Sequence, residues 1–449
     1  MARGKKKETL TPEDRLQAAL VPEGEQPYKV PKNWICFRFT SLIDIEGGTQ
    51  PPKSQFINEY REGYIRLVQI RDFASDKYIV FVPDTAKLKH FNEDDILIAR
   101  YGASLGRICT GMSGAYNVAL AKTIFSSNIL NRKYVYWMLQ SESFQAPLMG
   151  ISRTAQAGFN KEDLSTFAMP LPPLSEQQRI VDRIESLFAK LDEAKQKAQD
   201  SLDSFETRKA AILHKAFTGE LTAQWRKEHG VGMESWENVS VSEICHSLKY
   251  GTAKKSSSEG TVVVIRMGNL QDGEISWDDL AYSNDEEDIE KYKLVPGDVL
   301  FNRTNSPALV GKTSIYRGEY PAIYAGYLIK LDYDRSRIIG DYLNYSLNTV
   351  SAKEYCNSVK TDGVNQSNIN AKKIGAYIFA MPQIDEQAEI VRLLDDLLIK
   401  EQQAKEAAEG VLDQIDLIKK AILARAFRGE LGTNDPGEES VEELLFSKS

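Results

Sequence analysis

The sequence LSEQQRIV at Leu174–Val181 returns as IDEQAEIV at Ile384–Val391. The sequence KAAILHKAFTGEL at Lys209–Leu221 returns as KKAILARAFRGEL at Lys419–Leu431. Both pairs are offset by 210 positions, so the two copies have equal length between their conserved ends. An internal repeat of this kind indicates a duplicated structural unit.

Each copy predicts one long helix. Ser175 and Asp385 are suitable N-caps, and Gly219 and Gly429 are suitable helix stops. Some 45 residues at about 1.5 Å each would make a rod of roughly 65 Å, which is too long for the core helix of one domain. Apolar residues recur at four- and three-residue steps in both copies, as in a coiled coil: Ile180, Ile184, Leu187, Leu191, Ala194, Ala198, Phe205 and Ile212, then Ile390, Leu394, Leu397, Ala404, Ala408, Val411, Ile415, Ile418 and Ile422. We therefore expect the two helices to pair, antiparallel, although Ser201, Arg208 and Glu401 interrupt the stripe.

Length and composition are typical of a globular protein of about three domains: 449 residues, 42% hydrophobic and 27% charged. No apolar run approaches the ~20 residues that span a membrane, and the N-terminus MARGKKKETLTPEDR lacks the apolar stretch of a signal peptide. The four cysteines are far apart and form no CxxC pair, which favours a reduced cytoplasm. Cys245 and His246 are neighbours, but they would need distant ligands to hold a metal.

The net charge of −8 is unevenly distributed. Residues 31–173 carry 16 Lys+Arg against 13 Asp+Glu, whereas residues 234–383 carry 16 against 20, mainly through SNDEEDIE at Ser283–Glu290. Lys5, Lys6 and Lys7 lie in a polar arm, residues 1–30, in which Thr11–Leu20 predicts a short helix. Total charge therefore neither establishes nor excludes a nucleic-acid partner.

The repeated helices alternate with two segments of mixed, mostly β pattern. The first, residues 31–173, contains strand-like ICFRF, YIRLVQI, DDILIAR and VALAKTIF and a short helix at Asn131–Ser141. The sequence thus predicts an N-terminal arm (1–30), domain 1 (31–173), helix 1 (174–233), domain 2 (234–383), helix 2 (384–431) and an acidic tail (432–449).

The second segment repeats the landmarks of the first in the same order. We align Trp236 with Trp34, Gly251-Thr252 with Gly48-Thr49, Arg266 with Arg66, Asn269 with Gln69, Arg303 with Arg100, and Gly311-Lys312 with Gly106-Arg107. The residues between these landmarks differ greatly. The layout is therefore a duplicated half, domain followed by helix, with an expected α+β fold and pseudo-twofold repeat.

This layout resembles the specificity subunit of Type I restriction–modification enzymes over essentially the full length. LPPLSEQQRIV, KAAILHKAFTGEL, their second copies, the Trp and Gly-Thr start of each domain and GDVLFNR carry the resemblance. It implies two target-recognition domains on double-stranded DNA, each reading half of a bipartite target, with the helices setting the spacer. The acidic second domain departs from what a DNA-facing surface requires.

The resemblance also implies partners and cofactors. Two methylation subunits and restriction subunits are expected to assemble with the chain, and S-adenosylmethionine, ATP and Mg are expected on those partners rather than here. We expect methylation subunits to dock on the outer faces of the helices and on their repeated ends, through Phe217 and Phe427.

Motifs for catalysis within the chain are weak. Gly311-Lys312-Thr313 lacks the phosphate-loop glycine five positions earlier, where Ser306 stands, and strand-like residues follow it. There is no GxGxxG and no Asn-Pro-Pro-Tyr of adenine methylases, and the four histidines are isolated. The sequence therefore predicts no catalytic residue and no metal site.

Polar loops are the candidate DNA-reading elements, because Arg reads guanine, Asn and Gln read adenine, and Lys, Ser and Thr hold phosphates. The candidates in domain 1 are Thr49, Gln50, Lys53, Gln69, Arg71, Arg100, Tyr101, Ser104, Arg107 and Arg153. Those in domain 2 are Lys249, Tyr250, Thr252, Lys254, Lys255, Asn269, Asn302, Arg303, Thr304, Asn305, Lys312, Lys360, Asn365 and Gln366. Each could instead be a solvated turn or a structural hydrogen bond, and Arg66 and Arg266 fit a salt-bridged scaffold equally well.

Two other functions remain open at this point. The chain could be a coiled-coil scaffold whose two domains bind proteins, or a free transcription regulator. Salt-dependent binding to one split DNA sequence would favour the specificity subunit over the scaffold. Co-purification with an adenine methylase would favour it over the regulator.

Overall fold

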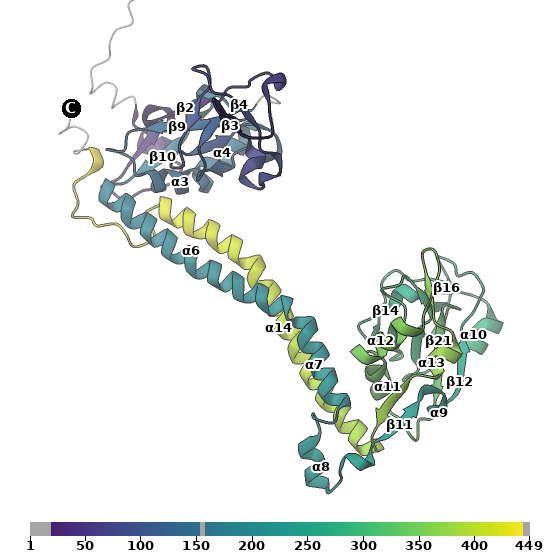
Figure 1. The fold of residues 1–449 in the computed structure, drawn as a ribbon. Coiled ribbons are helices and arrows are strands. Elements are labelled where there is room, and N and C mark those ends of the chain that lie inside the picture. Colours follow the sequence, from purple (N-terminus) through teal and green to yellow (C-terminus); the bar gives the residue numbers. More distant parts are fainter. Residues whose placement is uncertain (1–18, 153–157, 443–449) are drawn as a thin grey trace, which may run out of the picture. The chain divides into compact units, whose positions relative to one another are not determined.

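The computed structural model describes residues 19–152 and 158–442, which divide into two compact units. Unit 1 joins residues 1–197 to residues 410–449, and unit 2 is residues 198–409. Each unit contains a mixed α/β domain and a pair of helix segments (Figure 1). Lys5 to Lys7 and nearly all of the helix predicted at Thr11–Leu20 lie outside the described residues. Within the described part, no helix is both long and apolar enough to cross a bilayer.

The domain of unit 1 is built on two small sheets. One has the strand order β2-β9-β6-β7 and the other β4-β3-β8-β5, with β3 and β8 parallel. Helix α3 starts at the N-cap Asn131, whose side chain accepts from the Tyr134 amide, as the Asn131–Ser141 prediction requires. The bounds are β1 (Ile35–Arg38), α2 (Phe39–Leu42), β2 (Ile43–Gly47), β3 (Tyr64–Val68), β4 (Phe81–Pro83), β5 (His90–Phe91), β6 (Leu97–Ala99), β7 (Ile108–Cys109), β8 (Gly114–Tyr116), β9 (Leu120–Phe125), α3 (Arg132–Gln140), α4 (Glu142–Ser152), α5 (Lys161–Leu164) and β10 (Ala168–Leu171).

The domain of unit 2 repeats this plan with additions. Its larger sheet runs β12-β21-β17-β19-β15-β14, and a second sheet runs β16-β13-β20. A small sheet, β18-β23-β22, is added near the end of the domain. The bounds are β11 (Glu237–Ser240), α9 (Val241–Ile244), β12 (Cys245–Tyr250), β13 (Val262–Ile265), β14 (Leu270–Gln271), β15 (Glu274–Ile275), β16 (Tyr282–Ser283), α10 (Glu286–Tyr292), β17 (Val299–Asn302), β18 (Thr304–Asn305), β19 (Thr313–Ile315), β20 (Ala322–Tyr324), β21 (Leu328–Tyr333), α11 (Gly340–Leu347), α12 (Val350–Val359), β22 (Thr361–Asp362), β23 (Ser367–Asn368), α13 (Ala371–Gly375) and β24 (Ile378–Met381).

Parallel strands align the two domains residue by residue. Val68 pairs with Tyr116 in domain 1, and Ile265 pairs with Tyr324 in domain 2. Gln69 and Arg266 then follow at equivalent positions. The main-chain amide of each donates to a side-chain oxygen of the residue three positions later, Asp72 or Asn269. The sequence alignment of Arg66 with Arg266, and of Gln69 with Asn269, is therefore wrong by three residues, because it followed residue type rather than strand register.

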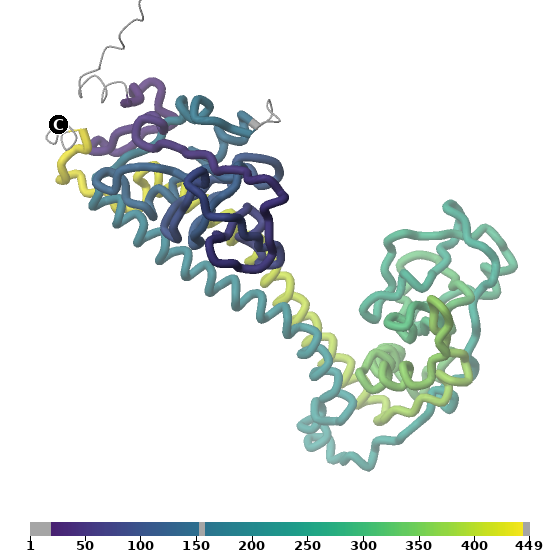
Figure 2. The backbone as a smooth tube through the Cα atoms, turned by 45° about the horizontal axis from the view of Figure 1, so that its top comes forward, coloured from purple at the N-terminus to yellow at the C-terminus, as the bar shows by residue number. Residues whose placement is uncertain are grey.

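The long helices are α6 (Leu174–Asp203), α7 (Phe205–Phe217) and α14 (Ile384–Phe427), and α8 (Ala223–His229) follows α7. In unit 1, Lys419 of α14 reaches Asp192 of α6, so the C-terminal part of α14 lies beside the N-terminal part of α6 (Figure 2). In unit 2, Arg208 of α7 donates to Glu401 of α14 at 2.8 Å. The helix segments are antiparallel within each unit.

The helix ends and one helix interior differ from the prediction. The helices begin at Leu174 and Ile384, so Ser175 and Asp385 lie in the first turn rather than at the N-cap. The first copy is not one helix, because Ser204 separates α6 from α7. The Ser204 hydroxyl donates to the Asp200 carbonyl, and Arg208 donates to the Ser201 carbonyl, so side chains compete there for helical acceptors.

The buried stripe also differs from the one read in the sequence. Phe188 is buried in place of the predicted Leu187, and it contacts Trp137 of α3 with ring centroids 5.0 Å apart. Val411 and Ile418, predicted in the stripe, are exposed. The helices pack on their recognition domain as well as on each other, which widens the buried face beyond a coiled-coil stripe.

A duplicated set of hydrogen bonds fastens each domain to the start of its long helix. The indole of Trp34 donates to Glu176 at 2.7 Å, and that of Trp236 donates to Glu386 at 2.9 Å. The next residue, Gln177 or Gln387, is fully buried. The Gln177 carboxamide donates to the carbonyls of Ile129 and Pro172 and accepts from the Asn131 amide. The sequence repeat at 176–177 and 386–387 thus encodes an identical attachment in each unit.

The C-terminal segment packs onto unit 1 rather than extending as a free tail. Asn434 donates to Glu176 and to Asn33, and Glu438 forms a two-pronged ion pair with Arg179. Val441 is buried in the core of the unit, and its amide donates to the Asn33 carbonyl. In unit 2 the place of this segment is taken by Thr222 and Arg226, which donate to Glu386.

Candidate nucleic-acid interface

In domain 1, the predicted loops converge because the strands that carry them are neighbours. The amide of Thr49 donates to Tyr116 and its hydroxyl to Lys87, which places the 47–55 loop at the end of β8. Arg107 donates to the Phe73 carbonyl, so the 100–107 loop lies against the turn that carries Arg71. The Arg71 guanidinium in turn lies 5.0 Å from the Tyr78 ring.

Arg100 and Arg303 occupy equivalent positions at the end of β6 and β17. The Arg100 guanidinium donates twice to the Phe159 carbonyl and lies 5.2 Å from the Tyr101 ring. The Arg303 guanidinium donates to Gly326 and lies 4.8 Å from the Tyr250 ring. Both arginines are therefore held by main-chain carbonyls and a tyrosine face, which fixes their orientation and leaves fewer donors for a ligand.

In domain 2, several candidate residues gather on the small sheet β18-β23-β22. Thr304 and Asn305 lie on β18, opposite Asn368 and Ser367 of β23. Asn365 and Gln366 are exposed in the connection between β22 and β23, and Lys360 precedes β22. No strand pattern is recognisable in this stretch of sequence, because each strand is only two residues long.

Three candidate residues of domain 2 are buried inside the domain, where they have almost no exposed surface to offer to DNA, and their role as DNA contacts stays a prediction. Asn269 donates to the Ser276 and Asp278 carbonyls, and Thr252 donates to Asp288. Asn302 is fully buried in β17. Arg153 lies outside the described residues. Partly or fully exposed candidates are Thr49, Gln50, Lys53, Gln69, Arg71, Arg100, Tyr101, Ser104 and Arg107 in domain 1, and Lys249, Tyr250, Lys254, Lys255, Arg303, Thr304, Asn305, Lys312, Lys360, Asn365 and Gln366 in domain 2.

The acidic cluster of domain 2 has a structural role. Asp285 caps α10 and accepts from Lys254 at 2.8 Å, and Asp288 accepts from Thr252. The hydrogen bond from Lys254 lowers the pKa of Asp285, and the reciprocal bond raises the pKa of Lys254, so both stay charged and paired. Much of the cluster thus organises α10 and its neighbouring loop.

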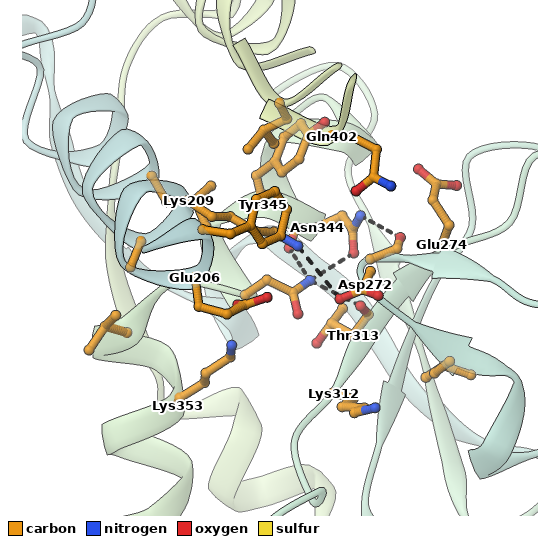
Figure 3. A pocket seen from close by; sticks show the side chains of 18 of the residues that line it. Glu206, Lys209, Asp272, Glu274, Lys312, Thr313, Asn344, Tyr345, Lys353 and Gln402 are labelled. Carbon is orange, nitrogen blue, oxygen red and sulfur yellow. Dashed lines mark hydrogen bonds and ion pairs between the residues drawn. The ribbon is translucent and has the colours of Figure 1, made fainter. Parts of the chain in front are cut away.

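A cavity of about 790 Å³ lies inside unit 2, between the helices α7 and α14 and the domain (Figure 3). Its polar groups are mostly paired with one another. Lys209 of α7 lies 3.6 Å from Asp272, Tyr345 donates to Asp395 of α14 at 2.6 Å, and Asn344 donates to the Gly273 carbonyl. The contacts of Lys209 with Asp272 and of Tyr345 with Asp395 tie the domain to the helices.

Other chemistry-bearing groups are likewise engaged in structure. Lys312, the lysine of the weak phosphate-loop match, donates to Gln271 and directly precedes strand β19. Among the described residues, no cluster of His, Cys, Asp and Glu could hold a metal ion. Burial raises the pKa of the Cys36 and Cys356 thiols to about 11, so they stay protonated and unreactive at neutral pH.

The helix ends predicted to dock partners are partly structural. Phe427 is fully buried, and its ring lies 5.3 Å from that of Tyr134 in α3. Phe217 is half-buried against Tyr342 in α11, at 5.0 Å. Each ring therefore fastens a domain to a helix end, and the role of the two rings in partner docking stays a prediction. The exposed large hydrophobic side chains of α14 are Ile384, Ile399, Val411, Leu417 and Ile418.

Comparison with known proteins agrees with this architecture. The family model described as "Type I restriction modification DNA specificity domain" matches residues 31–202 and 233–409. The chain is 24% identical to the Type I restriction enzyme EcoKI specificity subunit of Escherichia coli K12, and 23% identical to the StySPI specificity subunit of Salmonella potsdam; each match covers 90% of both chains. The MjaVIII specificity subunit of Methanocaldococcus jannaschii is 26% identical, over 90% of this chain and 94% of the relative.

Solved structures share the fold. The HsdS subunit from Thermoanaerobacter tengcongensis superposes with a TM-score of 0.63 at 19% identity, covering 90% of this chain and 99% of the other. A chain from a study of complex assembly and conformational transition in the type I R-M system gives a TM-score of 0.64 at 18% identity, covering 90% and 100%. The chain is α+β with two recognition domains, and it belongs to the family of DNA specificity subunits of Type I restriction–modification systems.

Proposed function

We propose that this chain selects a bipartite DNA target, with domain 1 (residues 31–173) and domain 2 (residues 234–383) each reading one half-site. The observation that carries the proposal is a duplicated frame that bears different loops. Trp34 and Trp236 make the same bond in the two domains. The polar loop around Arg107 in domain 1 nevertheless differs in residue type from the loop around Lys312 in domain 2, which also carries the β22–β23 connection. One shared frame with two unlike polar surfaces suits two different half-sites.

Phosphate and base contacts would be divided among the exposed candidates. Lys53, Arg71 and Arg107 in domain 1 and Lys249, Lys255 and Lys360 in domain 2 suit phosphates. Gln50, Asn365 and Gln366 offer the paired donor and acceptor that adenine requires. Arg100 and Arg303 act mainly by positioning neighbouring loops, since main-chain carbonyls hold their guanidinium groups.

The long helices would form a coiled-coil spacer and the docking surface for two methylation subunits, with restriction subunits joining that complex. The exposed apolar side chains of α14 support this role. Leu417 is 64% exposed and Ile418 is 41% exposed, although both lie mid-helix next to the buried Ile415. An apolar strip of this kind on a helix indicates a protein partner. Catalysis and its cofactors would then reside on the partners.

A domain exchange tests the division of labour. Residues 31–173 are replaced by the same segment of a relative, and the chain is expressed with its methylation subunit. Sequencing of methylated adenines should show one changed half-site and one unchanged. A change in both half-sites, or no sequence-specific methylation by the unaltered complex, would contradict the proposal.

A pair of substitutions tests the docking surface. Ile418→Asp together with Leu417→Asp should abolish co-purification of the methylation subunit while thermal unfolding stays unchanged, because both side chains are exposed. Asp413→Ala, at another exposed position of α14, is the matched control. Retention of the methylation subunit by the double variant would refute this docking surface.

A further inference from the structure

The connection between β22 and β23 presents an apolar residue to solvent. Val364 is 100% exposed, which no other large hydrophobic residue of the described chain approaches; the next is Tyr60 at 72%. It lies in the four-residue tip Gly363–Gln366, between Asp362 and Ser367 at the ends of the two strands. Exposed apolar surface carries a hydration cost, which contact with an apolar group of a ligand would remove.

The tip rests on a firm base. The Gly363 amide donates to the Gln366 carbonyl at 2.7 Å and closes the hairpin. Below it, Ser367 is fully buried and donates to Asp362. Asn368 donates to Thr304 of the third strand at 2.8 Å, and Lys373 donates to Thr361 at 2.7 Å. Side-chain bonds on both strands therefore hold the tip in one place.

The chemistry of the tip matches one edge of double-stranded DNA. The major groove, which is about 12 Å wide, admits a two-stranded β ribbon. The major groove has one apolar group, the 5-methyl of thymine, and adenine offers the paired donor and acceptor that Asn and Gln read. Val364 is followed directly by Asn365 and Gln366, both exposed. Lys360 and Lys372 lie close in sequence on either side, with a charge suited to phosphates.

We propose that Val364 is a specificity-determining residue that contacts the 5-methyl group of a thymine in the major groove of the half-site read by domain 2, with Asn365 and Gln366 bonding adenine. This inference rests on the proposed function and narrows it. It predicts that the second half-site contains an A·T pair whose thymine methyl is read directly.

The experiment removes the thymine methyl group from the DNA and, separately, the Val364 side chain that is proposed to contact it. The target is first obtained from the methylome of the complex with methylation subunits, and the domain exchange assigns its halves. Each thymine of the second half-site is then replaced, one at a time, by deoxyuridine, which lacks the methyl. At one position, binding by the wild-type complex should weaken about fourfold, which corresponds to about 0.8 kcal/mol for one methyl-sized group.

Val364→Ala supplies the other side of the comparison. This variant should bind the thymine target about fourfold more weakly, and it should no longer distinguish thymine from deoxyuridine at that position, because the two changes remove the same contact. Val295→Ala, at another exposed valine of the domain, is the control and should keep both the affinity and the penalty for deoxyuridine.

Several outcomes would overturn the inference: a second half-site without an A·T pair, equal binding of all deoxyuridine duplexes by the wild type, or a Val364→Ala variant that keeps the penalty. Loss of the methylation subunits from Val364→Ala in size-exclusion chromatography would also overturn it, since the tip would then contact protein. Failure of the wild-type complex to methylate any specific sequence would instead remove the proposed function itself.

Discussion

At the scale of single residues, the Glu386 carboxylate depends most on its hydrogen-bond partners, because it is a buried charge. It is 1% exposed and accepts from Thr222, Arg226 and Trp236. Arg226 is itself buried, and its other hydrogen bonds do not neutralise its charge. Glu386→Leu should therefore destabilise unit 2 by about 3–5 kcal/mol, since the arginine charge would be left buried without its partner.

Hydrogen exchange at the start of α14 and urea unfolding would measure this loss. Glu389→Leu is the matched control. It removes a carboxylate one turn later that bonds Arg392 within the same helix, and it should change stability by less than about 1 kcal/mol. Equal losses for the two variants would mean that burial of the ion pair contributes nothing.

The ion pair between Arg179 and Glu438 makes the attachment of the C-terminal segment sensitive to acid. The hydrogen bond from Arg179 lowers the pKa of Glu438. A lowered pKa contributes stability that is present above the ordinary glutamate value of about 4.3 and is lost as pH falls through the lowered value. Nearby Glu176 has the opposite effect on how stability depends on pH, because burial raises the pKa of its carboxyl group.

Protection of the Val441 amide against hydrogen exchange should therefore fall as pH drops below about 4. In Glu438→Gln, protection at pH 7 should already be about fivefold lower, the effect of about 1 kcal/mol expected for a partly exposed pair. Its remaining acid dependence should be weaker than that of the wild type. An unchanged pH profile in the variant would exclude Glu438 as the titrating group.

At the scale of elements, three glycines in the long helices have different roles. Gly219 and Gly429 follow α7 and α14 with φ values of 79° and 76°, so they end the helices in the left-handed region. Gly410 lies inside α14, and a Cβ there would meet nothing within 4 Å. Gly410→Ala should stabilise the chain by about 0.5–1 kcal/mol.

Gly429→Ala should destabilise unit 1 by more than about 1 kcal/mol, because its Cβ would also lie 2.4 Å from the Pro31 ring. Gly219→Ala should cost less, since its Cβ would meet the flexible Met233 side chain at 2.7 Å. Thermal unfolding of the three single variants checks this order. A destabilising Gly410→Ala would show that the mid-helix glycine is needed for bending or close packing.

The sequence predicted the elements better than it predicted their contacts. The 210-residue offset identified the duplicated helices, whereas the attachment of each domain through Glu176 and Gln177 and their second copies became visible only in the structure. The sequence did not predict which polar residues are buried, because their burial depends on strands that are distant in the sequence. Asn269 and Asn302 look like polar loop residues, yet register places them inside the domain. Phe188 was passed over for Leu187 because the packing of α3 is not visible in a helix pattern. Val364 was missed since no sequence signal marks an exposed tip.

At the scale of the whole molecule, the helices should determine the gap between the half-sites. Lengthening after Leu221 would not extend a helix, because α7 ends at Phe217 and Gly219 turns the chain. The insertion must be made within α6 and at the paired place in α14, after Ala194 and after Gln414. Four residues in each helix add at most about 6 Å, the length of one or two base pairs.

A methylome of that variant should contain both original half-sites with a gap longer by one or two base pairs, because no recognition loop is altered. Insertion of four residues in the exposed turn after Glu319, which carries no candidate DNA contact, is the control and should leave the gap unchanged. An unchanged gap in the helix variant would assign the spacing to the partner subunits.

The buried glutamines that fasten each domain to its helix bond only to main-chain groups. Gln387 donates to the carbonyls of Arg337 and Pro382 and accepts from the Ile339 amide, while Gln177 makes the same bonds with Ile129, Pro172 and Asn131. Asparagine in one copy and isoleucine in the other serve equally, because every residue except proline offers a main-chain amide donor. A recognition domain can therefore diverge, or be replaced by recombination, without retuning its attachment. At these bonds the glutamines place no requirement on the side chains of the domain that they hold, whereas the indoles of Trp34 and Trp236 must be retained for the bonds to Glu176 and Glu386.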